Sequence, residues 1–191
     1  MYRQYARTVF LLCCLVFGPV SFVWANGPAD AYKVSCSKFE LYNGTSWVTI
    51  FSGTSTSIDI ASVSSGQSAG NFISGLNIPD GTYSQMRVTP VATFTIKGND
   101  GSGRYTTSTV GGSGGCVYTN TSSSEAQCTV SVQGGVTATT NTLSPAITIS
   151  NGIPNYTVRV SFDTSSAIQY VGAADELFPA APTVTISVVS L

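Results

Sequence analysis

The sequence predicts an all-β protein built as an antiparallel β-sandwich, and three observations predict it. Charged residues make up only 9% of the chain, whereas Ser and Thr are abundant. Val, Ile, Phe and Tyr recur with period 2 through most of the chain. Beyond residue 25, no apolar repeat with helical spacing continues for more than a turn or two. Low-complexity disorder is the alternative for so few charges, but the period-2 pattern argues against it.

The first 25 residues differ from the rest and predict a cleaved signal peptide. Two arginines come first, an unbroken apolar run follows at Val9–Phe17, and Ala25 completes a suitable cleavage site. A membrane anchor would need about 20 apolar residues. Lipid attachment at Cys13 would need a small residue where Leu12 stands. We therefore expect a protein that is secreted, periplasmic or at the cell surface, with no membrane span after processing.

The remaining chain has the length of one domain with a sizeable core. We expect a short leader at 26–30 and a single β-sandwich domain at 31–191. Asn43-Gly44 predicts a hairpin between the first two strands, and Phe94 and Ile96 should share one face of a later strand. A Ser/Gly-rich connection is expected at 62–69. The strands are expected at 31–42, 47–52, 57–61, 71–78, 82–91, 93–97, 116–118, 128–133, 146–149, 156–162, 167–170 and 183–189.

The stretch Leu76–Val88 reads as the end of a strand, a tight turn and a second strand. Pro79 sets the φ that a β-turn requires at its first central position, and Gly81 supplies a positive φ without steric cost. Tyr83 is out of phase with the apolar residues that follow it. This predicts a β-bulge near Ser84–Gln85, with the Tyr83 ring packed over the sheet end and its hydroxyl bonded to backbone.

The Pro-x-Gly-Thr-Tyr turn at 79–83 resembles a turn of prealbumin-like (transthyretin-like) β-sandwiches. The wider chain resembles bacterial secreted and lipoprotein domains of unknown function with that fold. The other matching pieces are a first hairpin from Lys33 to Val48, the strand Ile58-Asp59-Ile60, and a penultimate strand at Val158–Asp163. The resemblance implies a prealbumin-like sandwich and no established catalytic residues. Many members begin with a lipid-modified Cys, and this chain departs from them there.

Export would place the cysteines that remain after processing in an oxidising compartment. Cys116 and Cys128 flank a polar loop between two strand-like pieces, so we expect a disulfide that clamps a hairpin and contributes about 3 kcal/mol. Two free thiols are the alternative. Cys36 alternates with Tyr32 and Val34, as a buried small apolar residue does. A bridge to another cysteine or to a partner is the alternative for Cys36. The apolar phase changes after Cys36, which predicts a bulge or a change of face before residue 39.

Residues 98–115 form the one long glycine-rich tract and are expected to be a loop, either functional or a tolerated insertion. Asn99 and Asp100 open it, and Tyr105 and Tyr118 lie in and beside it. These four are the candidate binding residues, because exposed aromatic and polar side chains at a loop suit sugar or protein ligands. Asn99-Asp100-Gly101 lacks the alternating acidic ligands of a calcium loop, so an ordinary turn is expected there.

The side chains that the sequence contains exclude several kinds of catalytic and metal-binding site. The chain has no His, which removes Ser-His-Asp and Cys-His catalysis and His-ligated zinc. Zinc held by Cys alone needs more thiols than remain. Only Asp175 and Glu176 are adjacent acids, and neighbours on a strand point to opposite faces. No helix pattern follows Gly111–Gly115, so the tract is a linker and no phosphate loop. We expect no enzyme, metal or cofactor. Removal of Arg3 and Arg7 with the signal peptide leaves six basic and nine acidic residues, and this net charge of −3 argues against nucleic acid.

Two further segments have an ordinary and a functional interpretation. Trp47, just after a hairpin turn, is expected to cap the core, and sugar stacking is the alternative. Thr183–Val189 is expected to be an internal strand, and donation to a neighbouring subunit is the alternative. The function expected is a non-catalytic, secreted or envelope-associated binding or adhesion module for a cell-surface glycan or protein, acting through its loops. The alternative is a self-associating subunit of a surface filament or matrix assembled by strand addition. A hydrolase is the third hypothesis.

Overall fold

A computed structural model describes residues 26–62 and 76–191, and nearly all of its regular structure is antiparallel β-strand. This confirms the fold class at the level of an all-β protein with antiparallel sheets. The predicted connection at 62–69, except for residue 62, and the predicted strand residues 71–75 lie outside the described residues. The elements are β1 (Asn26–Gly27), β2 (Ala29–Val34), β3 (Cys36–Tyr42), β4 (Trp47–Ser52), β5 (Ile58–Asp59), β6 (Gly81–Pro90), β7 (Thr93–Gly98), β8 (Tyr105–Val110), β9 (Cys116–Thr119), a 3₁₀ turn η1 (Ser122–Ser124), β10 (Cys128–Ser131), β11 (Thr139–Ser150), β12 (Ile153–Pro154), β13 (Tyr156–Asp163), β14 (Ile168–Val171), β15 (Glu176–Pro179) and β16 (Thr183–Ser190).

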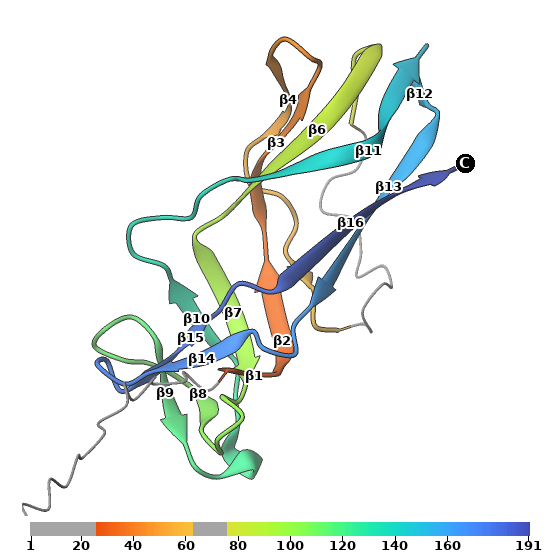
Figure 1. Ribbon diagram of the computed structural model, residues 1–191. Helices are drawn as coiled ribbons and strands as arrows, with labels where there is room; N and C mark the ends of the chain where they lie inside the picture. Colours follow the sequence, from red (N-terminus) through yellow and green to blue (C-terminus); the bar gives the residue numbers. More distant parts are fainter. Residues whose placement is uncertain (1–25, 63–75) are drawn as a thin grey trace, which may run out of the picture.

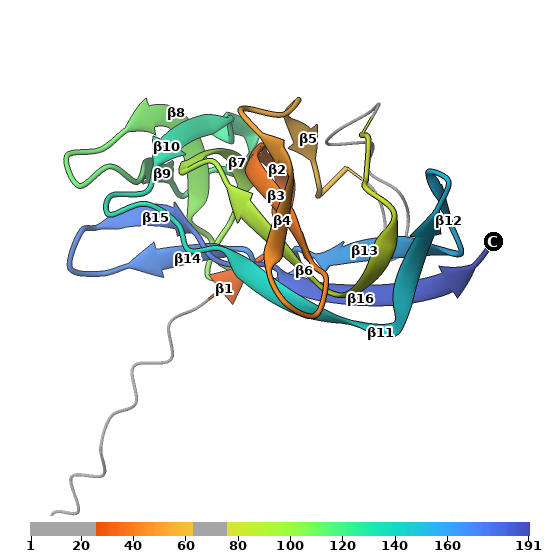
Figure 2. The same ribbon diagram turned by 90° about the horizontal axis from the view of Figure 1, so that it is seen from above.

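The strands form four separate sheets, and the chain passes between them several times. The first sheet has the order β1-β14-β15-β9-β8, the second β10-β7-β2-β5, and the third β12-β11-β6-β3-β4. The fourth is a two-stranded ribbon of β13 and β16. Ser35 alone separates β2 from β3, so one extended segment passes from the second sheet into the third. The ribbon runs beside the third sheet and leads into β14 of the first (Figures 1 and 2).

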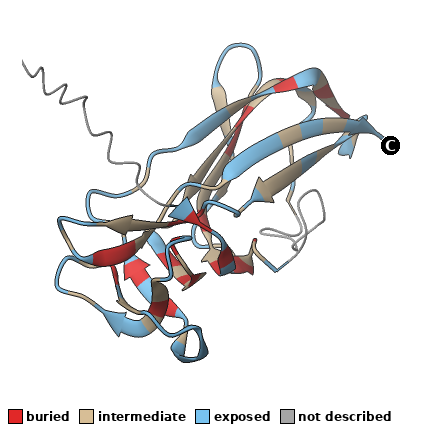
Figure 3. Cartoon of the chain, turned by 60° about the horizontal axis from the view of Figure 1, so that its bottom comes forward, coloured by how far each residue is buried: buried red, intermediate tan, exposed pale blue. Residues whose placement is uncertain are grey.

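Two apolar clusters lie between these sheets. One joins the first and second sheets, and its members include Ile96 and Ile168, which are fully buried. The other lies on the third sheet around Leu41 and Met86, and the ribbon contributes only partly buried residues such as Val160. Figure 3 shows no fully buried residue on the strand that ends at the C-terminus. The molecule is therefore closed at one end and more open at the other.

The first hairpin forms as its turn residues predict. β3 pairs with β4, and Gly44 at the turn has a φ of 92°. The Asn43 side chain accepts hydrogen bonds from the backbone N–H groups of Thr45 and Ser46. The register between β3 and β6 shifts between Cys36 and Lys38, which confirms the bulge expected after Cys36.

The hairpin predicted at Leu76–Val88 is wrong. The described residues before the turn, from Leu76 to Pro79, form no strand, and β6 pairs with β3 and β11. The Tyr83 side chain is buried and its hydroxyl donates to the Pro79 carbonyl at 2.8 Å, as expected. The register shifts opposite Ser84, but the additional residues lie on β11. Pro79–Gly81 is thus a corner that Tyr83 fixes onto β6.

The loop predicted at 98–115 is wrong in its centre, because β8 (Tyr105–Val110) runs through it. Ser and Thr dominate β8, so no apolar alternation marks it as a strand. The disulfide between Cys116 and Cys128 is confirmed, with a Cα–Cα distance of 6.0 Å. The hairpin it was expected to clamp is not formed: β9 pairs with β8 and β15, and β10 pairs with β7. The disulfide joins the first sheet to the second.

Several strand bounds also differ from the prediction. The leader at 26–30 contributes β1, which pairs with β14, and the beginning of β2. β11 begins at Thr139, well before the predicted residue 146, and its polar first half pairs with β6. β15 (Glu176–Pro179) was not predicted. β16 was predicted to be internal, but among the described residues it pairs only with β13.

Candidate functional site

The two predicted aromatic binding residues lie on adjacent strands of the first sheet. Thr106 of β8 stands opposite Tyr118 of β9, and Tyr105 stands opposite Thr119. Because successive residues of a strand point to opposite faces, this register places Tyr105 and Tyr118 on opposite faces. Asn99 meets Tyr105 through a backbone bridge, and its side chain accepts from the Gly101 N–H at 2.9 Å. The structure therefore does not combine the two tyrosines into one stacking surface.

Asp100 is fully buried and serves the turn that contains it. Its Oδ1 accepts from the backbone N–H groups of Ser102 and Arg104, and its Oδ2 accepts from Arg104 Nη1 at 2.7 Å. Burial alone would raise the pKa of Asp100. The hydrogen bonds from Arg104 and from the backbone outweigh burial, so the pKa lies below its usual value. Every oxygen of this carboxylate is thus used inside the protein.

Arg104 also organises a group of side chains around Tyr118. Its guanidinium carbon lies 3.9 Å from the Tyr170 ring centre and 5.6 Å from the Tyr118 ring centre. Both tyrosine hydroxyls donate to Asp175 Oδ1, at 3.1 Å from Tyr118 and 2.7 Å from Tyr170. The hydrogen bond from Tyr170, then that from Tyr118, lowers the pKa of Asp175. The polar groups of this cluster bond to one another. Tyr170 and Asp175 lie more than 50 residues after Arg104 and Tyr118 in the sequence, so no local motif could reveal them.

The glycine-rich turn at 111–115 is held by a buried carboxylate. Glu176 accepts from the backbone N–H of Ser113 at 2.9 Å and from that of Gly115 at 2.7 Å. A Cβ on Gly111 would collide with the Glu176 carboxylate, so close backbone approach requires glycine there. Asp175 is exposed in the turn before β15, with a φ of 55°, and Glu176 is the buried first residue of that strand, so the turn and not strand alternation separates the two acids. The tract predicted to be a flexible linker is therefore a compact turn with a structural role.

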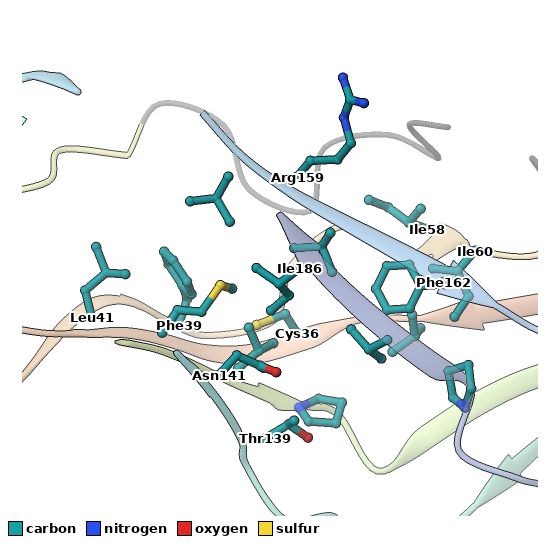
Figure 4. A pocket seen from close by; sticks show the side chains of 18 of the residues that line it. Cys36, Phe39, Leu41, Ile58, Ile60, Thr139, Asn141, Arg159, Phe162 and Ile186 are labelled. Atoms are coloured by element: carbon teal, nitrogen blue, oxygen red, sulfur yellow. The ribbon is translucent and has the colours of Figure 1, made fainter. Parts of the chain in front are cut away.

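A large cavity in the described residues lies between the ribbon and the third sheet, and no sequence motif indicated it. Its volume is about 1510 Å³, and it is partly open to solvent. Side chains from both apolar clusters form its walls (Figure 4). The apolar side chains among the lining residues include Tyr32, Val34, Phe39, Leu41, Ile58, Ile60, Leu76, Ile78, Met86, Val88, Phe94, Ile147, Ile149, Val158, Val160, Phe162, Val184 and Ile186.

The cavity follows from the unequal width of the two layers. Neighbouring strands lie about 4.8 Å apart, so a two-stranded ribbon spans less than half the width of a five-stranded sheet. Val158 and Val160 of β13 line the cavity together with Leu41 and Met86 of the third sheet, and both valines remain only partly buried. Such a mismatch depends on which strands share a sheet, and periodicity along the chain carries no information about that.

Few polar side chains line the cavity. None of the described lining residues is acidic, and Arg159 is the only charged one. Cys36, which is buried and outside the disulfide, lines the wall. Burial raises the pKa of the Cys36 thiol, so the thiol stays protonated at neutral pH. Burial also raises the pKa of Tyr32 to about 12, and its hydroxyl donates to the Ala180 carbonyl at 3.1 Å.

Trp47 does not cap the core as predicted. It is half-buried and belongs to neither apolar cluster. The guanidinium carbon of Arg87 lies 4.2 Å from its ring centre, and the Tyr42 ring lies 5.3 Å away. Arg87 also donates to the buried carboxylate of Glu40 at 2.8 Å, so Trp47 covers an ion pair at the sheet surface.

Within the described residues, no helix is long and apolar enough to cross a membrane. The disulfide fits an oxidising compartment. No protein-family model, curated protein or solved structure proves similar to this chain. The apolar cavity is consequently the best-supported candidate site.

Proposed function

We propose that this chain is a non-catalytic binding module, secreted or held at the cell envelope, and that it binds an apolar ligand in the cavity between the ribbon and the third sheet. The observation that supports this proposal most directly is a cavity of about 1510 Å³ with mostly apolar walls and no acidic lining residue. Ligand pockets are usually concave, mostly apolar and supplied with few polar groups. The binding site differs from the loop site that the sequence favoured.

Three properties of the chain support this function. The cavity exposes apolar walls to solvent, and a ligand that removes this surface from water would gain roughly 25 cal/mol per Å². The absence of His from the chain leaves the cavity without the commonest general base. The signal-peptide pattern and the disulfide both favour an exported protein. A prealbumin-like type of sandwich is part of the same proposal.

Binding of the neutral dye Nile red tests the proposal. Its fluorescence should rise on mixing with the protein, and Val184→Asp should reduce the affinity at least several-fold, because a charge in the wall must be desolvated by an apolar ligand. Val184 lines the cavity and is 38% exposed, so the variant can fold. Thr185→Asp, the next residue on the outer side of β16, is the matched control.

Near-ultraviolet circular dichroism should show that both variants keep the native packing. Val160→Asp, on the other strand of the same ribbon, provides a second test of the same point. Absence of Nile red binding by the folded wild-type protein, or equal losses in the wall variants and the control, would refute the binding function.

A structural subunit assembled by strand addition is the second candidate. Among the described residues, β13 and β16 pair only with each other, so each has an edge without ladder hydrogen bonds. β16 is uncharged and exposes Val184 and Val189. An added strand could pair with such an edge and cover the cavity at the same time.

This second function predicts polymers that grow with protein concentration and are visible by electron microscopy. Deleting Thr183–Leu191 should then abolish assembly and leave a folded monomer. Unfolding of the truncated monomer would show that β16 is essential to its own subunit, and strand donation by β16 would be wrong.

A further inference from the structure

We infer that the ligand of the cavity is a phospholipid with one net negative charge, whose acyl chains occupy the cavity and whose phosphate meets Arg159. This inference rests on the proposed function and adds the chemical class of the ligand. It follows from the composition of the walls, from the size of the cavity, and from the position and surroundings of one guanidinium group.

The walls and the volume favour acyl chains. Apolar side chains predominate in the lining, and the uncharged polar side chains are few, such as Thr139 and Asn141. A ligand with many hydrogen-bonding groups would lose its bonds to water there without replacement. The volume of about 1510 Å³ exceeds the usual range of about 300–1,000 Å³ for pockets that hold drug-sized ligands. A molecule with two long hydrocarbon chains suits such a space, because each buried methylene contributes to binding.

Arg159 lies at the edge of this apolar space. It stands between Val158 and Val160 on β13, and both valines line the cavity. Residues alternate between faces along a strand, so the Arg159 side chain leaves the cavity while its neighbours enter it. Figure 4 shows its guanidinium extending away from the apolar side chains. Arg159 thus lies on the face of the ribbon that points away from the cavity. Among the described residues β13 pairs only with β16, so its other edge is free, and a lipid can pass this edge with its charged group on Arg159 in water and its chains inside.

The guanidinium of Arg159 has no counter-ion in the protein. All nine acidic residues of the chain lie in the described ranges, and none forms an ion pair with Arg159. The other described cations are engaged: Lys38 and Arg87 pair with Glu40, Lys97 with Asp30 and Glu125, and Arg104 with Asp100, while Lys33 donates to Gln127. Arg159 is thus available to an external anion.

A phosphodiester is the anion that this arrangement fits. A guanidinium can donate two parallel hydrogen bonds to two phosphate oxygens, which gives orientation as well as charge neutralisation. No acidic residue lines the cavity, so a negative head group meets no repulsion there. A lipid whose head group also carries one positive charge gains less from Arg159, because the charge of its phosphate is already compensated.

Competition against Nile red with short-chain lipids tests the inference on the full protein. The probes are dioctanoyl phosphatidylglycerol, dioctanoyl phosphatidylcholine and dioctanoylglycerol, which share their acyl chains and differ in charge. Phosphatidylglycerol should bind roughly two- to fivefold more tightly than the other two, as an ion pair near the surface allows. Arg159→Gln should remove this preference, and Arg159→Lys should keep part of it.

Lys33→Gln is the matched control, because it removes a cation of β2 that is not among the lining residues. It should leave the preference unchanged. The rate at which a small thiol reagent labels Cys36, read by peptide mass spectrometry, should fall when phosphatidylglycerol is bound. This second readout locates the lipid in the cavity.

The outcomes separate the inference from the proposed function. Equal binding of the three lipids, or a preference that survives in Arg159→Gln, would overturn the head-group assignment and leave the apolar site intact. Nile red binding without competition by any lipid would overturn the lipid class, and an extended peptide would become the better occupant. Lipid binding that appears only after residues 63–75 are replaced by a Gly-Ser linker would overturn the lipid as the natural occupant and assign the cavity to the protein's own chain. Failure of Nile red to bind would refute the proposed function itself.

Discussion

At the scale of single residues, buried carboxylates hold the irregular parts of the chain in place. Glu176 is the clearest case, because both of its oxygens accept backbone N–H groups of the turn at 111–115. Glu176→Gln keeps the shape but replaces one acceptor by a donor that faces a backbone N–H. We expect a loss of about 1–3 kcal/mol in the free energy of unfolding, measured with urea.

Asp30→Asn is the matched control, since it also removes one negative charge but Asp30 is exposed. It should change the free energy of unfolding by less than about 0.5 kcal/mol. Equal stability of Glu176→Gln and the wild-type protein would show that the turn does not depend on this carboxylate.

Glu40 makes the stability of the protein depend on pH. The hydrogen bond from Arg87 is the largest cause that lowers the pKa of Glu40 to about 2, and Lys38 adds to it against the effect of burial. An unfolded chain titrates glutamate near pH 4.3. The folded pKa is the lower one, so this stabilisation is complete above about pH 4.3 and disappears as the pH falls towards 2.

Comparison of the wild-type protein with Glu40→Gln checks this prediction. The variant should be less stable by roughly 2 kcal/mol at neutral pH, because charged hydrogen bonds are lost. The difference should shrink between pH 4 and pH 2 in urea titrations. A difference that stays constant over this range would contradict the assigned ion pair.

At the scale of elements, the sequence predicted strands well where apolar residues alternate and poorly where Thr and Ser dominate. Phe94 and Ile96 are both buried on one face of β7, as expected. β8 and the first half of β11 carry mostly hydroxyl side chains, which fit a strand without revealing its buried face. Short β15 has the same difficulty, because four residues hold too little periodicity.

Pairing was harder to predict than strand positions. Tyr83, Cys36 and the two bonded cysteines were placed correctly by local arguments. The cavity was not predicted, because it depends on a two-stranded ribbon lying opposite a five-stranded sheet. Proximity in sequence also misled the assignment of β9 and β10, which lie in different sheets. Local chemistry determines a turn or a bulge, whereas sheet membership depends on contacts between distant segments.

The disulfide is the covalent link between β9 of the first sheet and β10 of the second. Replacing both Cys116 and Cys128 by Ala should lower the free energy of unfolding by about 3 kcal/mol, because the unfolded chain regains freedom. Peptide mapping without reductant should recover Cys116 and Cys128 in one linked pair. Recovery of Cys36 in a mixed disulfide with either of them would contradict the structure.

At the scale of the whole molecule, the two ends differ in how completely they are packed. The first and second sheets share a cluster with fully buried Ile96, Ile168 and Leu177, and the disulfide crosses it. At the other end the ribbon covers only part of the third sheet. A protein packed in this way holds a stable frame at one end and can admit a ligand at the other.

This asymmetry predicts where a ligand should act. Local opening requires the least free energy where few apolar contacts are made, so β13 and β16 should exchange amide hydrogens faster than β7 and β10. A ligand that fills the cavity at 100 times its Kd stabilises the folded protein by about 2.7 kcal/mol. Nile red should therefore raise Tm and slow exchange mainly in β13, β16 and the facing strand β6. Protection confined to β8 and β9 would instead place the ligand at the Arg104 cluster, and uniform protection would show that the two ends unfold as one unit.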